Sequence, residues 1–531
     1  MPEPIDRAVF LCALMHAHAY PHPVWTIEHL ETHISDIFLT GDYAYKLKKP
    51  LNLGFLDFST LERRRFCCEE ELRLNRRLAP ELYLSVVPIA GTASSPRIDG
   101  SGTIMDYAVQ MRQFDQRGML ERLAASGDLT MATVDAIADQ VAQFHTGLPP
   151  AAPESHYGSA AQIIAPMLQN FEQLQPLIES DADRDTLSKL RKWTEDRHGE
   201  LAELFDQRRR DGFVRECHGD LHLGNIVLVD GRVRIFDCIE FNPQLRWIDV
   251  INEVAFLVMD LIQRGYASLA YRFLNRYLEH TGDYAGVPLL RYYMVYRALV
   301  RAKVAGMRAG QSGVEATTQS RLRDKCRAHI ELAQRLVNDP RPMLIIMHGL
   351  SGSGKTVLSQ IALEVVGAIR VRSDVERKRL HGLAATVRTN SGVGEGLYAA
   401  SAGQATYENL AALAKHIIAS GSPALVDAAF LKRQQRMQFQ VLAANYKVPF
   451  AILDVQASEP TLRRRVALRA AAGTDASEAS EAVLERQLAS QERLTSEEEV
   501  WSHGFDGECL TPETVAAQLL AIARASAAIN R

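Results

Sequence analysis

The hydrophobic pattern of the first 337 residues predicts a strand-rich beginning followed by a mainly helical continuation. Within 39–48, the polar turn at 40–42 separates two apolar stretches, which predicts a β-hairpin. Asp230 and Gly231 give a second tight-turn signal between two short apolar strands. The other predicted elements are strands at 84–89, 102–111, 227–229 and 233–236, and helices at 59–78, 131–145, 159–207 and 247–337.

A different pattern begins after 338–342, a polar stretch that contains two prolines. Residues 343–347 are an apolar run typical of a buried strand, and a helix that ends at about residue 366 follows. Short apolar strands then alternate with helices, as in a parallel α/β sheet. The sequence therefore predicts two domains, 1–338 and 339–531, of which the first is α+β and the second is α/β.

Composition narrows the class of protein without naming a function. The chain has 531 residues, too many for one core, with 47% hydrophobic and 23% charged residues. Its formal net charge of −4 argues against a nucleic-acid partner. The N-terminus lacks a secretory pattern, and no apolar run is long enough for a membrane helix, so no membrane association is expected. Seven cysteines without a C-x-x-C pair indicate reduced thiols and a cytoplasmic protein, whose oligomeric state stays open.

Residues 218–225, HGDLHLGN, carry the residue types that phosphoryl transfer requires. This chemistry needs metal to neutralise phosphate charge and a residue that orients or deprotonates the attacking hydroxyl. Asp220 is placed to accept the proton of the substrate. Asn225 and Asp237, which follows an apolar strand, offer the hard oxygen donors that Mg²⁺ requires. The alternative interpretation is a capped loop in an unrelated fold.

The spacing of these residues resembles the aminoglycoside phosphotransferase and choline-kinase-like branch of the kinase fold. The resemblance covers roughly 25–330 and implies a two-lobed α+β domain that binds ATP. It also implies that Lys46 contacts the nucleotide phosphates and that Glu71 is its helix partner, with Glu70 as the alternative. The loop at 32–36 is not glycine-rich and departs from the pattern of the family. A solvated edge strand is the other interpretation of Lys46, and a surface acid is the other interpretation of Glu71.

Residues 349–356, GLSGSGKT, match the Walker A pattern. They follow a predicted strand and open a predicted helix, which is the context that the motif requires. In such a loop, backbone amides bind phosphate, Lys355 reaches the β and γ phosphates of ATP, and Thr356 ligates Mg²⁺. The predicted nucleotide-binding residues are Gly349, Ser351, Gly352, Ser353, Gly354, Lys355 and Thr356.

Residues downstream of this loop favour a small kinase over a motor ATPase. Asp374 follows the second predicted strand and is expected to orient or deprotonate an acceptor hydroxyl, whereas Asp427 is a Walker-B-like carboxylate for the Mg²⁺ shell. Arg465 and Arg469 lie four residues apart on one helix face and are expected to neutralise charge on the transferring phosphoryl group. They lead into 473–478, which we interpret as a mobile lid. The alternative interpretation of Asp374 is a helix N-cap. The alternative interpretation of Arg465 and Arg469 is a solvated basic helix face.

This second set of residues resembles the P-loop kinases related to zeta toxins, gluconate kinases and polynucleotide kinase. The order of the two halves resembles a bacterial bifunctional family that joins an aminoglycoside-phosphotransferase-like domain to an ATP-binding kinase. From the residues and this resemblance together we expect a bifunctional ATP-dependent phosphotransferase with two ATP·Mg²⁺ sites, acting on small-molecule hydroxyl acceptors. The alternative is a P-loop kinase or ATPase regulated by a kinase-like domain that senses a nucleotide or metabolite without turnover.

Overall fold

A computed structural model of the chain describes residues 6–52, 54, 56–311, 314–384, 387, 400–472 and 480–529. The predicted lid at 473–478 lies outside the described residues. The chain divides into two compact units. The first consists of 1–133, 147–260 and 299–328, and the second consists of 134–146, 261–298 and 329–531. Among the described residues, four helices are divided between the units: α4 (Met131–Gly147), α7 (Val250–Gln263), α9 (Val287–Ala309) and α10 (Ala316–Asn338).

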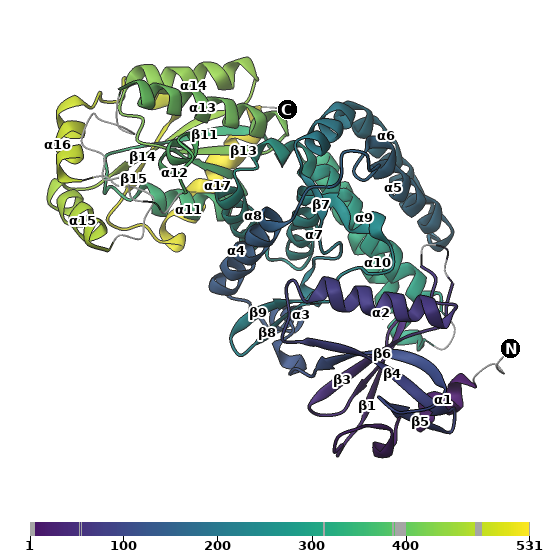
Figure 1. Ribbon diagram of the computed structural model, residues 1–531. Helices are drawn as coiled ribbons and strands as arrows, with labels where there is room; N and C mark the ends of the chain where they lie inside the picture. Colours follow the sequence, from purple (N-terminus) through teal and green to yellow (C-terminus); the bar gives the residue numbers. More distant parts are fainter. Residues whose placement is uncertain are drawn as a thin grey trace. The chain divides into compact units, whose positions relative to one another are not determined.

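An antiparallel sheet of six strands forms the N-terminal part of the first unit (Figure 1). The predicted hairpin at 39–48 is confirmed as the pairing of its second and third strands along the chain. In spatial order the strands are β1 (Glu28–Glu31), β2 (Ser35–Leu39), β3 (Tyr43–Lys48), β6 (Ile104–Arg112), β4 (Tyr83–Thr92) and β5 (Ser95–Ile98).

The two faces of this sheet bury different kinds of side chain, because successive residues of a strand point to opposite faces. On β3, Tyr45 and Leu47 enter an apolar core together with α1 (Arg7–Ala13). Lys46 and Lys48 therefore point to the other face, where α2 (Leu61–Asn75) packs on the sheet. The period of the strand thus places two lysines under one helix.

The remainder of the first unit holds helices and two small antiparallel pairs of strands. The second predicted hairpin is confirmed, since β8 pairs with β9 around Asp230 and Gly231. In the pair β7–β10, strand β7 directly precedes the segment 218–225 in the sequence. The bounds are α3 (Leu120–Ser126), α5 (Ala160–Leu174), α6 (Asp181–Arg210), β7 (Val214–Glu216), β8 (Ile226–Val229), β9 (Arg232–Ile235), β10 (Trp247–Asp249) and α7 (Val250–Gln263).

A parallel sheet of five strands is the centre of the second unit, as the sequence predicts. Its outermost strand β15 was not predicted, because its sequence, SHGFD, has a single large apolar residue. In spatial order the strands are β12 (Ile369–Arg372), β13 (Pro423–Asp427), β11 (Met343–His348), β14 (Phe450–Gln456) and β15 (Ser502–Asp506).

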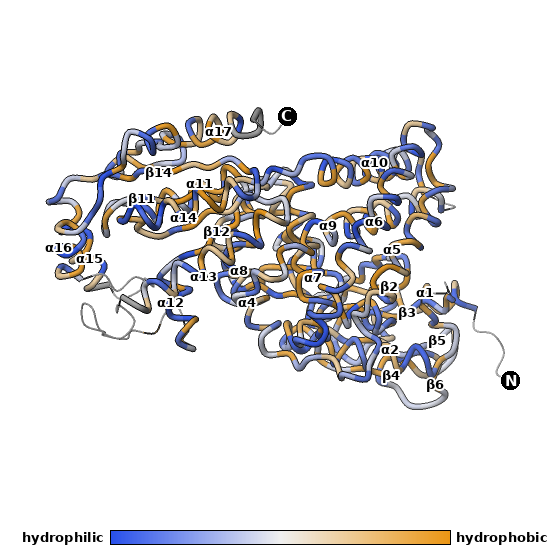
Figure 2. Tube along the Cα trace, turned by 90° about the horizontal axis from the view of Figure 1, so that it is seen from above, coloured by the Kyte–Doolittle hydropathy of each residue, from blue (hydrophilic) through white to orange (hydrophobic). Residues whose placement is uncertain are grey.

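Helices cover both faces of this sheet (Figure 1). On one face, α11 (Lys355–Val366) and α17 (Pro512–Ile529) share an apolar core with β11 and β14. Figure 2 shows hydrophobic residues along α17 and β14. On the other face lie α13 (Ala400–Ala419) and α14 (Arg433–Asn445). The other helices of this unit are α4 (Met131–Gly147), α8 (Ala267–Thr281), α12 (Ser373–Leu380), α15 (Glu459–Ala472) and α16 (Glu481–Ser490).

A membrane-spanning helix is absent from the described part of the chain, where every helix is too short or too polar to cross a bilayer. All seven cysteines are free thiols, and five of them are buried. The prediction of reduced cysteines agrees with this arrangement.

Candidate active sites

A network of two lysines and three carboxylates lies between β3, α2 and the segment after β9, and all of its members except Asp237 are buried. Lys46 donates to Glu71 at 2.8 Å and also contacts Asp237. Lys48 donates to the other oxygen of Glu71 and to Glu240. Lys48 and Glu71 are fully buried, so these charges are compensated within the protein rather than by water.

Glu71, and not the alternative Glu70, is the helix partner of Lys46. Glu71 points toward Lys46, whereas Glu70 pairs with Arg73 and Arg246 away from it. Lys48 and Glu240 are not among the residues predicted from the sequence. For Lys48 a signal existed, because a residue two positions beyond Lys46 on a strand points to the same face.

The catalytic segment brings Asp220 and Asn225 into contact. The amide nitrogen of Asn225 donates to the carboxylate of Asp220 at 2.9 Å and to its backbone carbonyl at 3.0 Å. Because that nitrogen is used in these bonds, the amide oxygen of Asn225 is the atom that fits a metal ion. Asp237 adopts a left-handed backbone, with φ of 65°, which aims its carboxylate at Lys46. These hard oxygen donors fit Mg²⁺.

Two carboxylates on α7 hold the catalytic loop by its backbone amides. Glu253 accepts from His218 N at 2.9 Å and from Gly219 N at 2.6 Å, and Asp260 accepts from Leu223 N at 3.0 Å. Both carboxylates are buried. They therefore bind backbone amides of the loop that would otherwise lack hydrogen-bond partners. These acids therefore support the loop.

Hydrogen bonds of the loop hold the rings of its two histidines in place. His218 Nδ1 accepts from Asp220 N, so its proton lies on Nε2, which donates to Phe236 O at 2.8 Å. His222 Nδ1 likewise accepts from Gly224 N at 3.0 Å, and its Nε2 lies 3.3 Å from Asp220 Oδ2 and 3.1 Å from Arg301 Nη1. Burial lowers the pKa of His218, so its ring is neutral and acts as a hydrogen-bonded residue of the loop.

The carboxylate of Asp220 is kept ionised by its surroundings. Burial alone would raise the pKa of Asp220, but His222 and Arg301 outweigh burial and hold the pKa below its usual value. An ionised carboxylate is the form that can accept a proton from an alcohol. One-third of this side chain is exposed, so a substrate can reach it.

The turn between β1 and β2 stands where the kinase fold places its nucleotide loop. Thr32 closes this turn: its hydroxyl accepts from Ser35 N at 2.9 Å, and its backbone N–H donates to Ser35 O, also at 2.9 Å. Ser35 itself is fully buried. The turn is short and side-chain-capped, in agreement with the absence of glycines from 32–36.

The second site is built around the loop between β11 and α11. Gly349, Gly352 and Gly354 have φ of 140°, 86° and 108°, values that favour glycine. A Cβ on Gly349 would lie 2.4 Å from Val455 O, and one on Gly352 would lie 2.8 Å from Leu462 O. The hydroxyl of Ser353 is buried and has no hydrogen-bond partner among the described residues. The loop therefore has the shape of a phosphate cradle, which fits the predicted nucleotide.

Lys355 folds back over this loop. Its ammonium group donates to Gly349 O at 2.8 Å and to Leu350 O at 2.7 Å. Burial lowers the pKa of Lys355 to about 8, although Asp427 and Asp374 oppose the shift.

We expect the affinity of the second site for ATP to fall above pH 8. Below this pKa Lys355 is a cation that attracts phosphate, and above it the amine is neutral, so affinity should decrease about tenfold between pH 7 and pH 9. Calorimetric titration of the full chain with Mg²⁺ and ATP over this range would measure the change. Lys355→Arg stays charged and should give a flat profile, and a decline of equal size in that variant would contradict the assignment.

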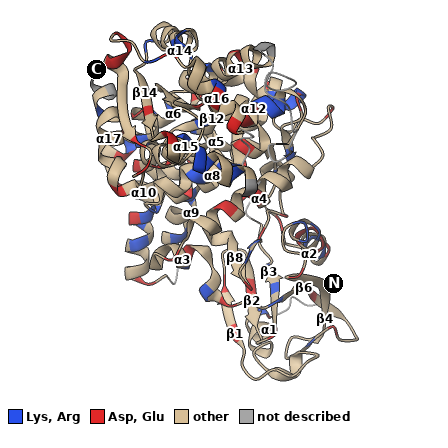
Figure 3. Ribbon diagram, turned by 90° about the vertical axis from the view of Figure 1, so that its left-hand side faces the viewer, with Lys and Arg blue, Asp and Glu red and all other residues tan. Residues whose placement is uncertain are grey.

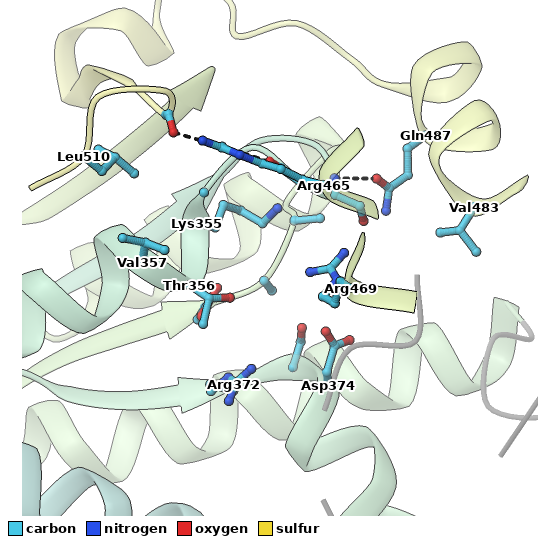
Figure 4. Close-up of a pocket in the computed structure, with 18 of the residues that line it drawn as sticks. Lys355, Thr356, Val357, Arg372, Asp374, Arg465, Arg469, Val483, Gln487 and Leu510 are labelled. Atoms are coloured by element: carbon cyan, nitrogen blue, oxygen red, sulfur yellow. Dashed lines mark hydrogen bonds between the residues drawn. The ribbon is translucent and has the colours of Figure 1, made fainter. Parts of the chain in front are cut away.

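A cavity of about 550 Å³ opens beside the loop and collects the predicted residues of this half (Figure 4). Lys355, Thr356, Asp374, Asp427 and both arginines of α15 line it. The lining also includes residues that were not predicted as site residues, namely Val357, Arg372, Arg377, Tyr407, Val483, Gln487, Gly507, Glu508 and Leu510.

The two predicted carboxylates lie at the ends of neighbouring strands, since Arg372 of β12 pairs with Asp427 of β13 and Asp374 follows two residues later. Asp427 ends β13 and accepts from the hydroxyl of Ser359 on α11 at 2.9 Å. Asp374 lies in the first turn of α12 and is not its N-cap, which is Arg372. Arg377, one turn later, donates to Asp374 at 3.1 Å. The helix α12 carries a cluster of basic residues, blue in Figure 3.

Arg465 and Arg469 on α15 make different contacts. Arg465 donates to Gly352 O at 3.2 Å and to Gly507 O at 2.9 Å, so it ties the phosphate loop to the segment after β15. Figure 4 shows Arg469 pointing into the cavity toward the side of Asp374. On α16, Gln487 accepts from the amide of Ser351 at 2.8 Å, which covers one end of the loop.

Gly507→Ala is expected to lower ATP turnover at this site by about 100-fold. An added Cβ would lie 1.8 Å from Ser353 O, so the phosphate loop must move, and a misplacement of about 1 Å can cost that factor. Phosphate release from ATP by the full chain would measure it. Gly504→Ala is the matched control, because its Cβ meets nothing within 4 Å. Equal rates in both variants would contradict the role of this close approach.

Arg436 on α14 neither lines the cavity nor lies at the surface. Its side chain is fully buried in the second unit. It donates to both carboxylate oxygens of Glu498, at 2.6 and 3.0 Å, and to Phe430 O at 3.0 Å. Arg436 is thus a structural ion pair, which composition alone does not distinguish from a substrate ligand.

The two halves match two different protein families. Residues 67–290 match the family described as "Phosphotransferase enzyme family", and residues 344–494 match the family described as "AAA domain". An uncharacterized protein of Mycobacterium tuberculosis is 30% identical over 458 residues, which cover 86% of this chain and 89% of that protein. A protein of Mycobacterium bovis matches to the same extent. The chain belongs to the family that joins a phosphotransferase domain to a P-loop kinase-like domain.

The folds of the two domains agree with this family. A solved amicoumacin kinase is 13% identical, with a TM-score of 0.39, over 61% of this chain and 93% of that chain. A gluconokinase from Sinorhizobium meliloti is 21% identical, with a TM-score of 0.26, over 36% and 98%. The predicted fold class is confirmed, and so is the prediction of a phosphotransferase enzyme that uses ATP and a divalent metal ion.

Proposed function

We propose that both domains of this chain are active, so that it is a bifunctional phosphotransferase that moves phosphate from ATP to hydroxyl groups of small molecules. The observation that carries the proposal is that each half has its own lysine and its own carboxylates in one place. Lys46 with Glu71 and Asp237 serves the first site, and Lys355 with Asp427 serves the second. Each set suffices for a separate ATP·Mg²⁺ complex.

In the phosphotransferase domain, Asp220 acts as the catalytic base. Its ionised carboxylate accepts the proton of the acceptor hydroxyl as the hydroxyl attacks phosphorus. Lys46, held by Glu71, binds nucleotide phosphates. Asn225 and Asp237 hold Mg²⁺, which neutralises phosphate charge when bound.

In the P-loop kinase domain, the amides of 349–356 and Lys355 bind the phosphates of ATP. Thr356 and Asp427 would hold Mg²⁺, and Asp374 orients the acceptor hydroxyl from the first turn of α12. Arg469 neutralises charge on the transferring group, and Arg465 contributes by fixing the shape of the loop.

The test separates the two sites within the full chain. Asp220→Asn and Lys355→Ala, singly and together, are incubated with ATP and a metabolite extract, and new phosphorylated species are identified by mass spectrometry. We expect each single variant to lose a different product and the double variant to lose both. Full phosphorylation of all products by the double variant would refute the proposal.

A second function deserves the same test because of one observation, the side-chain-capped turn at 32–35 that replaces a glycine-rich loop. In this alternative the phosphotransferase domain binds a nucleotide or metabolite without turnover and regulates the P-loop kinase domain. Full-length Lys355→Ala would then bind ATP, measured by calorimetry, and yield no phosphorylated product. Product formation that depends on Asp220 would exclude it.

A further inference from the structure

Helix α8 lies in the segment that matches the phosphotransferase family, yet it is part of the second compact unit. It packs against α11 and the edge strand β12 of the parallel sheet. Asn275 on α8 donates to Ala368 O at 2.9 Å and accepts from Arg370 N at 2.6 Å. The side-chain amide therefore supplies the hydrogen bonds that a neighbouring strand would give to β12.

One turn later on α8, Glu279 binds two arginines of β12. One carboxylate oxygen accepts from Arg372 at 2.7 Å, and the other accepts from Arg370 at 3.1 Å. The backbone carbonyl of Glu279 also accepts from Arg379 on α12 at 2.5 Å. Burial would raise the pKa of Glu279, but the two guanidinium groups outweigh burial and lower it, so the carboxylate is charged.

Both arginines connect Glu279 to the cavity of the P-loop kinase domain. Arg372 lines the cavity itself, two residues before Asp374. Arg370 donates to the hydroxyl of Ser359 at 3.1 Å, and that hydroxyl donates to Asp427 at 2.9 Å. The carboxylate of Glu279 thus holds Arg372 in one wall of the cavity directly, and it reaches the proposed metal ligand Asp427 through a chain of three hydrogen bonds.

We propose that Glu279 is a positioning residue of the P-loop kinase site, through which helix α8 of the phosphotransferase segment sets the geometry of that site. The inference rests on the proposed kinase function of this cavity. Partners behind a metal ligand orient it, and their loss typically costs about 10- to 100-fold in metal affinity or activity. Without the carboxylate, Arg370 and Arg372 keep their charge and are drawn toward Asp427 and Asp374, which changes how these acids hold metal and acceptor.

Glu279→Gln in the full chain tests the proposal, in an Asp220→Asn background so that ATP turnover reports on the P-loop site. The readouts are phosphate release from ATP with water as acceptor, its Mg²⁺ dependence, and the melting temperature. We expect kcat to fall by about 10- to 100-fold and the Mg²⁺ concentration for half-maximal turnover to rise.

Glu364→Gln is the matched control, because Glu364 forms another ion pair between α8 and α11, with Arg272 at 2.8 Å, and does not line the cavity. It should leave the Mg²⁺ requirement and kcat unchanged. Unchanged turnover in Glu279→Gln would overturn the inference. Equal losses of turnover and melting temperature in both variants would also overturn it, since they would indicate packing alone.

Lys355→Ala in the same background separates this inference from the proposed function. If it abolishes turnover while Glu279→Gln does not change it, the positioning role fails and the kinase assignment stands. If turnover persists in Lys355→Ala, the kinase assignment fails, and the role of Glu279 fails with it.

Discussion

Replacing Asp220 by asparagine is expected to lower phosphoryl transfer by the phosphotransferase domain by about 10²- to 10⁴-fold, the usual contribution of a general base. The asparagine side chain has the same shape as that of aspartate. Its amide oxygen can still accept the hydrogen bond from Asn225, whose nitrogen lies 2.9 Å from the Asp220 carboxylate in the parent protein. It cannot accept a proton from the acceptor. Transfer of labelled phosphate into the metabolite extract, in a Lys355→Ala background, measures the loss.

The matched control for this prediction is Asp230→Asn. Asp230 is an exposed residue at the tip of the β8–β9 hairpin with φ of 51°, a conformation that asparagine tolerates. The rate of phosphoryl transfer by Asp230→Asn should equal that of the parent protein. A rate for Asp220→Asn within the same range as the control would show that Asp220 is not the base. Equal ATP affinity in both variants would locate the effect in the chemical step.

Lys48→Met is expected to destabilise the first unit by about 3–5 kcal/mol, the cost of leaving a buried charge without its partner. Lys48 is fully buried and binds both Glu71 and Glu240. Methionine fills a similar volume, so the effect reports on the uncompensated carboxylate of Glu240 rather than on a cavity. Urea unfolding of the full chain, followed by a probe of the first unit, measures the loss.

The next residue in the sequence provides the comparison. Lys49 pairs with Glu31 near the surface, and Lys49→Met should cost about 0–1 kcal/mol. Adding Glu240→Met to Lys48→Met removes the orphaned charge and should recover most of the lost stability. If the double variant is as unstable as Lys48→Met alone, burial of charge is not the source of the effect.

Much of the fold follows from local patterns. The hairpins around 40–42 and Asp230 have polar turns between apolar strands, and the parallel sheet follows from the apolar runs at β11, β13 and β14. The strand β15 could not be predicted in this way, because it is held by pairing with β14 rather than by its own apolar residues.

Site residues within contiguous motifs could be predicted from the sequence, whereas those brought in by tertiary packing could not. Walker A residues and the segment 218–225 are contiguous, so their chemistry is readable from the sequence. Glu240, Gly507 and Glu279 reach their sites only through tertiary packing, and their sequence neighbourhoods carry no motif. Glu71 needed the structure as well, since Glu70 offers the same carboxylate one residue away.

The amide of Asn275 that completes the edge of β12 also bears on how this gene can be divided. A fragment beginning at residue 339 would keep every Walker residue but would leave the outer backbone groups of β12 open. Open strand edges recruit other chains, so such a fragment would tend to self-associate through that edge. Recombination that moves the P-loop half alone would meet the same obstacle, whereas a break upstream of α8 would carry the strand's cover with it.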